Sequence, residues 1–224
     1  MTRNEFCKSH WNYYMVLEKD FLNTERYLSF DLGDNYLYDG NSPTDLANSK
    51  AFSVEYIKQY LAICSEIDVI LKSICGELGD VASDTMLAYT STILGNSFWQ
   101  NIINQRVMFY DMELCPFANW STNPHNSPDW WSPYNGVKHK RLKNEKEANL
   151  KNVVNSLAGL FALENYLVKY IDNKITPTDL ANIDVPDDKS KAFEMLNWKT
   201  RWSVIGHNTY DIPEHEINAM FVRK

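Results

Sequence analysis

The sequence has little that would place the protein in or across a membrane. Its longest apolar runs, such as LAGLFAL at positions 157–163, are shorter than the roughly 20 apolar residues that a membrane-spanning helix needs. The first twenty residues carry charges throughout and contain no apolar stretch of the signal-peptide kind. We therefore expect a soluble, cytoplasmic protein with no membrane partner.

Cysteine is also scarce, and the four cysteines form no recognisable metal-binding or redox motif. They lie far apart, without a C-x-x-C pair. Cys7 and His10 have a short, ligand-like spacing, but no second pair of this kind completes a zinc site. We therefore expect no disulfide, no metal and no other cofactor. The P-loop, dinucleotide-binding, nucleophile-elbow and zinc-protease motifs are absent too, which sets aside P-loop nucleotide hydrolysis and zinc proteolysis.

Length and composition indicate one folded unit. The chain has 224 residues, 44% of them hydrophobic and 13% aromatic, as is usual for a protein with a packed core. We expect a single domain over residues 1–224, with a mixed insertion at 80–131 and a C-terminal extension at 172–224. A net charge of −7 argues against a generic nucleic-acid binder. Positions 138–146, however, hold four lysines, one arginine and one histidine against a single acid.

Apolar residues recur every three or four positions in three long segments, which predicts helices over residues 9–30, 50–78 and 149–171. A fourth helix is expected over residues 132–147 because of its start signal. We expect them to form a mostly α, four-helix bundle of antiparallel helices, with a small β-rich insertion and an irregular C-terminal tail. Ser132 is the expected N-cap of the third helix, with Pro133 as its first residue.

Several shorter features complete the expected fold. Residues 86–94 suggest a short helix. QRVMFYDMEL, at 105–114, is strand-like and is expected to pair with FWQNII, at 98–103. AFEML, at 192–196, suggests a short helix or strand, and WKTRWSVI, at 198–205, a strand. The string PTDLAN occurs at 43–48 and again at 177–182, and we attach no function to it.

The stretch SPYNGVKHKR, at 132–141, concentrates the candidate functional residues. Asn135 and His139 are four positions apart and so share one face of a helix. Lys138 flanks that face, and Tyr134 and Arg141 sit further round. Histidine can act as a general acid or base near neutral pH, and a fixed cation can stabilise charge on phosphate oxygens.

This stretch, together with the long helices, resembles the HEPN superfamily of toxins, abortive-infection proteins and other intracellular defence proteins. The family signature is an arginine, usually followed by asparagine or another polar residue, a few residues before a histidine. Asn135 and His139 match the polar residue and the histidine, Tyr134 stands where the arginine belongs, and Arg141 matches a second arginine often found after the histidine. The resemblance implies a two-fold dimer that cleaves RNA without metal, with the ribose 2′-hydroxyl as nucleophile.

Two functions follow as expectations. The leading one is a metal-independent endoribonuclease of a defence or toxin system, with catalytic residues Asn135, His139 and Arg141 and substrate contacts from Tyr134, Lys138, Lys140 and Lys143. The alternative is a non-catalytic HEPN-like homodimer that binds RNA, a nucleotide or a protein partner such as an antitoxin or regulatory protein.

Structural roles remain open beside these functions. The histidine can be a polar contact between helices, and the lysines a solvated helix face. Trp130 and Trp131 are more often packing residues than base-stacking platforms. On the second helix, Glu66 and Asp68 are a poor chelating pair, although an acid from this helix would reach His139 if the two helices pack together.

Overall fold

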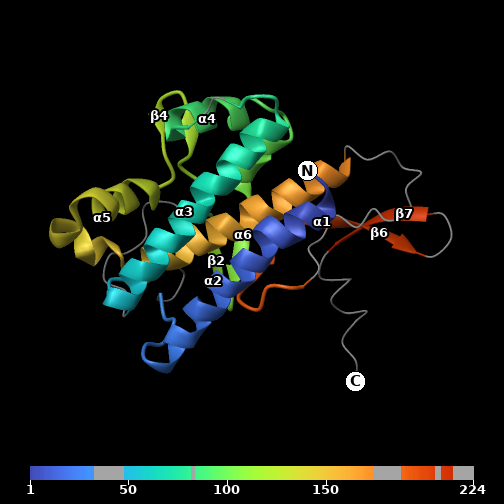
Figure 1. Cartoon of the computed structure of the whole chain (residues 1–224). Coiled ribbons are helices and arrows are strands. Elements are labelled where there is room, and N and C mark those ends of the chain that lie inside the picture. Colours follow the sequence, from blue (N-terminus) through green and yellow to red (C-terminus); the bar gives the residue numbers. More distant parts are fainter. Residues whose placement is uncertain (33–47, 82–83, 174–187, 205–207, 214–224) are drawn as a thin grey trace, which may run out of the picture.

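The fold is seen in a computed structural model that describes residues 1–32, 48–81, 84–173, 188–204 and 208–213. The chain is mostly α-helical, as predicted (Figure 1). No helix within these ranges is long and apolar enough to cross a membrane. Both copies of PTDLAN, apart from Asn48, lie outside the described residues.

The first helical segment runs from Arg3 to Arg26. It comprises α1 (Arg3–Phe6), a π-helical turn η1 (Cys7–Trp11), α2 (Asn12–Leu22) and a 3-10 turn η2 (Asn23–Arg26). Thr2 and Glu5 begin it with a capping box, in which each side chain accepts a hydrogen bond from the other residue's backbone N–H. The predicted helix 9–30 is therefore right in type, but it starts earlier and ends at Arg26.

Two long helices, α3 (Val54–Glu77) and α6 (Leu150–Asn173), lie side by side at the centre. The segment just before α3 is joined to the first turn of α6, because the N–H groups of Leu150 and Lys151 donate to the carbonyls of Ala51 and Ser49. The two helices therefore run in the same direction (Figure 1). The chain's amino terminus forms an ion pair with Glu77 at the far end of α3, so α2 runs the opposite way. In an antiparallel series of four helices the second and fourth run the same way, so these directions agree with that expectation for the segments 9–30, 50–78 and 149–171.

The connection between these parallel helices is long enough to cross the molecule. It contains α4 (Met86–Leu94), the 3-10 helix η3 (Trp99–Asn104) and the helix α5 (Trp131–Asn144), which is followed by a 3-10 turn η4 (Glu145–Glu147). The short helix at 86–94 is confirmed. FWQNII is η3 and not a strand, so the predicted pairing with QRVMFYDMEL is wrong.

QRVMFYDMEL instead folds back on itself. Strand β1 (Val107–Phe109) pairs with β2 (Met112–Leu114) through a tight turn in which Tyr110 has a φ of 52°. The free edge of β1 pairs with β5 (Phe193–Met195), which gives an antiparallel sheet in the order β2-β1-β5. AFEML therefore contains a strand, and this strand ties the C-terminal extension to the insertion.

Two further hairpins lie outside this sheet. Strand β3 (Ser121–Thr122) pairs with β4 (His125–Asn126), and β6 (Lys199–Val204) pairs with β7 (Asn208–Pro213). The strand predicted in WKTRWSVI is thus confirmed.

Helix α6 is the centre of the core. Every side chain from Asn152 to Val168 is buried, since the N-terminal helices, α3, η3, β1 and β5 all pack against it. A helix surrounded in this way is expected to be apolar on all sides. Gly159 allows close packing, because a Cβ there would lie 3.1 Å from the Trp130 ring. The polar residues of α6 are therefore exceptions that call for an explanation.

Candidate functional site

Helix α5 begins at Trp131, and its N-cap is Trp130, with no side-chain capping bond. The predicted N-cap at Ser132 is therefore wrong. The reason is packing, since Trp130 is fully buried and its Nε1–H donates to the carbonyl of Pro116 at 2.9 Å. The hydroxyl of Tyr60 on α3 donates to the Trp130 carbonyl. The two tryptophans thus anchor the helix start in the core, which confirms the packing interpretation.

A kink divides α5 at Lys140, where φ is −141° and ψ is 50°. The side-chain amide of Asn144 folds back and donates to the carbonyls of Gly136, at 3.1 Å, and Lys140, at 3.0 Å. Gly136 makes room for it, because a Cβ at this position would lie 3.2 Å from Asn144 Cγ. The helix predicted to run without a break over 132–147 is therefore interrupted at Lys140. The kink separates His139 from the residues that follow it.

Tyr134, at the position of the family's arginine, packs into the core. Only 3% of it is exposed, and its ring lies edge-on to Tyr60 and against Trp131. Burial raises the pKa of the Tyr134 hydroxyl. Lys138 extends over this ring, with Nζ 5.5 Å from the ring centroid. The residue that brings positive charge closest to Tyr134 is therefore Lys138.

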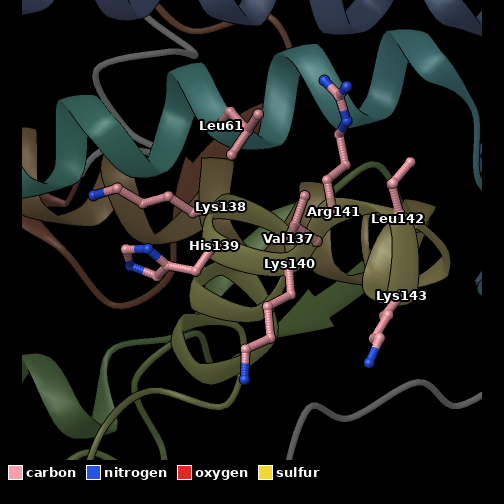
Figure 2. A pocket seen from close by; sticks show the side chains of 8 residues that line it. All are labelled: Leu61, Val137, Lys138, His139, Lys140, Arg141, Leu142 and Lys143. Carbon is pink, nitrogen blue, oxygen red and sulfur yellow. The ribbon is translucent and has the colours of Figure 1, made fainter.

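The exposed cations of α5 line a hollow of about 600 Å³ (Figure 2). The hollow is lined by Leu61 of α3 and by Val137, Lys138, His139, Lys140, Arg141, Leu142 and Lys143. Figure 2 shows Lys138 and His139 extending in the same direction, whereas Arg141 points toward α3 and Lys140 and Lys143 point away from it. The structure brings His139 together with Lys138, and Asn135 lies half-buried one turn earlier. Arg141 lines the same hollow, but its side chain points in a different direction from that of His139 (Figure 2).

The positive charge of this segment is not paired within the described part of the chain. No described acidic side chain forms an ion pair with Lys140, Arg141 or Lys143. All three are exposed, on a protein whose net charge is −7. We refer to Lys138, His139, Lys140, Arg141 and Lys143 as the α5 basic face.

Glu66, considered above as a partner for His139, lies elsewhere. Its carboxylate is 3.3 Å from Nδ1 of His10, and both side chains are buried. With Glu164 of α6 they form a cluster whose potential ligand atoms all lie within 4.8 Å of one another. Asp68, in contrast, forms the expected ion pair with Lys72 at 2.6 Å.

Sequence reasoning missed this cluster because its members come from three distant segments. One signal was available, however. Glu164 occupies a position in the apolar stripe of its helix, four residues after Leu160 and three before Leu167. An acid in such a position is rarely buried without a partner.

Comparisons of the chain with protein-family models, with curated proteins and with solved structures found no match.

Proposed function

We propose that the α5 basic face binds RNA through the phosphate backbone. The observation that supports this proposal is the concentration of exposed, unpaired cations on an otherwise acidic protein. Like charges three or four positions apart on a helix repel one another by a few tenths of a kcal/mol, and a bound anion would relieve this repulsion. A nucleic-acid backbone supplies negative charges at regular spacing and releases counterions when cations neutralise them.

The face favours recognition of the backbone over recognition of bases. Trp130, Trp131 and Tyr134, the aromatic residues nearest in sequence, are all buried. The lining of the hollow contains no tryptophan, tyrosine or phenylalanine. Sequence-specific recognition of single-stranded RNA usually stacks unpaired bases on aromatic side chains. We therefore expect binding that tolerates many sequences and depends strongly on salt.

A second candidate function is cleavage of the bound RNA, as the resemblance to HEPN nucleases of defence and toxin systems implies. The observation that favours it is the exposed imidazole of His139 beside the ammonium group of Lys138. The imidazole would take the proton of a ribose 2′-hydroxyl, and the 2′-oxygen would attack the adjacent phosphorus to form the 2′,3′-cyclic phosphate. The bond from phosphorus to the 5′-oxygen would break, that oxygen would take a proton from water, and Lys138 would stabilise the charge that develops on the phosphate. Lysine contacts phosphate as a point charge and not as a two-pronged donor, so we expect slow cleavage.

A second protomer would supply the further cations that the resemblance implies. Tyr134 packs in the core and Arg141 points toward α3, so neither adds a cation beside His139 within one chain. The proposal therefore includes a homodimer with a HEPN-like four-helix arrangement that brings two α5 basic faces together. It also includes an antitoxin or regulatory protein as the partner that would cover this face in a toxin system.

Binding of a fluorescently labelled mixed RNA pool, followed by anisotropy, tests the first candidate. The double variant Lys140→Gln/Lys143→Gln should bind more weakly than the wild type. The matched control is Lys8→Gln/Lys19→Gln, which removes two exposed lysines from the N-terminal helices and has the same net charge. No RNA binding by the wild type, or an equal loss in both variants, would refute binding at the α5 basic face.

Cleavage is tested separately, with EDTA present. The wild type should produce 2′,3′-cyclic phosphate ends, whereas His139→Ala should bind the RNA pool and leave it intact. Binding without any cleavage by the wild type would leave RNA binding as the whole function. Equal cleavage by both proteins would show that the activity does not come from His139.

A further inference from the structure

Three potential metal ligands meet in the core, away from the α5 basic face. His10 comes from η1, Glu66 from α3 and Glu164 from α6, and the segments that carry them pack together (Figure 1). Their exposed fractions are 3%, 8% and 0%. Buried ionisable groups are normally paired or bound to a metal ion, because leaving them uncompensated is costly.

Both ring nitrogens of His10 have polar neighbours. The hydroxyl of Ser73 lies 3.1 Å from the carbonyl of Val69, to which it donates, and 3.3 Å from Nε2 of His10. With the hydroxyl hydrogen on that carbonyl, the Ser73 oxygen accepts from Nε2–H, and this tautomer leaves the Nδ1 lone pair free to bind a cation. Nδ1 faces the Glu66 carboxylate at 3.3 Å.

Glu164 has no partner of its own. Both of its carboxylate oxygens are buried without a hydrogen bond among the described residues. Burial and the neighbouring Glu66 carboxylate raise the pKa of Glu164 well above its ordinary value. Glu18, another buried acid, has the hydrogen-bond partners that Glu164 lacks. It accepts hydrogen bonds from Tyr14, Ser190 and the backbone N–H groups of Lys191 and Ala192.

We propose that His10, Glu66 and Glu164 bind one divalent transition-metal ion, through Nδ1 of the histidine and one oxygen of each carboxylate. Such an ion would give Glu164 the partner it lacks and would lie between His10 and Glu66. Its two positive charges would balance the two carboxylates, which leaves the buried cluster neutral. Ser73 would then hold the histidine in the ligating tautomer, as hydrogen-bonded outer groups do in metal sites.

The geometry suits an ion of this size. Bonds from Zn²⁺ to imidazole nitrogen and carboxylate oxygen are about 2.0–2.2 Å, so two ligand atoms on one ion lie at most about 4.4 Å apart. The three ligand atoms here lie within 4.8 Å of one another, and small side-chain rotations close the difference. One nitrogen and two oxygens suit Zn²⁺, Mn²⁺ or Fe²⁺.

The local fold also supports a site at His10. This residue lies in a π-helical turn, a feature that is rare and frequently marks functional positions. The ion would join the N-terminal segment to α3 and α6, the two central helices. Because it is enclosed by the core, we assign it a structural role and not a catalytic one.

Metal uptake by the full-length protein tests the proposal. Protein stripped with chelator and dialysed should take up one equivalent of Zn²⁺, measured by elemental mass spectrometry. Its Tm should rise by about 5–10 °C at a hundredfold excess of Zn²⁺ over Kd. Mg²⁺, which prefers an all-oxygen site and keeps its waters, should give no such shift. The absence of both uptake and shift in the wild type would overturn the proposal, and Glu164 would then be a buried, protonated acid.

A variant distinguishes a metal-binding Glu164 from a buried, protonated Glu164. If Glu164 is a ligand, Glu164→Gln should lose the rise in Tm that Zn²⁺ gives the wild type. If Glu164 is simply protonated, Glu164→Gln should have the same metal-free Tm as the wild type. His125→Gln, which removes an exposed histidine from β4, is the matched control and should retain the full shift. Equal shifts in Glu164→Gln and the wild type would overturn the assignment.

Spectroscopy of the wild type does not depend on any variant folding. With Co²⁺ as the probe, the absorption spectrum should show nitrogen and oxygen ligation only. A thiolate-to-cobalt charge-transfer band would mean that a cysteine is a ligand and would overturn the proposed set. The α5 basic face shares no residue with the cluster, so failure of RNA binding would leave this proposal standing.

Discussion

The salt dependence of RNA binding gives a quantitative test of the α5 basic face. At pH 8 we count the four permanently charged residues of the face, Lys138, Lys140, Arg141 and Lys143, as one phosphate contact each. For a single strand, the logarithm of the binding constant falls against the logarithm of salt concentration with a slope of about −0.7 per contact, hence about −2.8. Between 50 and 200 mM salt, this slope lowers the affinity roughly 50-fold.

Removing two of these cations should change the slope by a known amount. For Lys140→Gln/Lys143→Gln, two contacts remain, so the slope should be about −1.4 and the affinity should fall only about 7-fold over the same range. The control Lys8→Gln/Lys19→Gln should keep the wild-type slope. Anisotropy titrations at several KCl concentrations measure all three slopes.

Two results would refute this reasoning. A wild-type slope near zero would show that phosphate neutralisation does not drive binding. An unchanged slope in Lys140→Gln/Lys143→Gln would show that these two lysines do not contact phosphate. A slope about twice as steep as expected, halved in the double variant, would instead show that two protomers contact the same RNA.

Three further predictions concern stability. Gly159→Ala should lower the free energy of unfolding by about 1–3 kcal/mol, because the added Cβ would press on the Trp130 ring. Gly76→Ala, where the added Cβ would meet no atom within 4 Å, should raise the free energy of unfolding by up to about 1 kcal/mol. Urea unfolding measures both changes, and the reverse order of stability would contradict the packing. Asn144→Ala removes both hydrogen bonds across the α5 kink and should cost about 1–2 kcal/mol, with faster amide exchange after the kink; unchanged exchange would contradict that role. Tyr134→Arg restores the arginine of the HEPN signature but buries a charge, so it should lower the free energy of unfolding by more than about 3 kcal/mol and add no RNA cleavage. A stable variant with more cleavage would show that this position contacts the substrate.

The apolar periodicity of the sequence was sufficient to predict where the long helices lie. It succeeded for α3 and α6 because both bury continuous stripes, and their apolar residues recur with the helical period. It does not by itself give their relative direction. That direction depends on backbone hydrogen bonds between residues about a hundred positions apart, where the N–H groups of Leu150 and Lys151 meet the carbonyls before α3. No local pattern encodes such a contact.

The start and the kink of α5 could not be predicted from the sequence for a related reason. Ser132 followed by Pro133 is a good local start signal, but burial of Trp130 outweighs it and begins the helix earlier. Helix propensity is a weak preference that tertiary packing commonly overrides. The kink depends on an asparagine that reaches back to Gly136, and the sequence shows only the two separate residues. Asn135 and His139 lie one helical turn apart, as predicted, because both precede the kink.

The α5 basic face and the buried cluster both include a residue of α3 or border on one, but separate experiments test them. Helix α3 provides Leu61 to the lining of the basic hollow and Glu66 to the buried cluster. Loss of a metal ion from the cluster would lower the stability of α3 and so the fraction of protein able to bind RNA. It would not change the number of cations that meet phosphate. Chelation should therefore lower Tm and leave the salt slope of the remaining folded protein unchanged, whereas substitution of the lysines should change the slope and leave the Zn²⁺ shift intact.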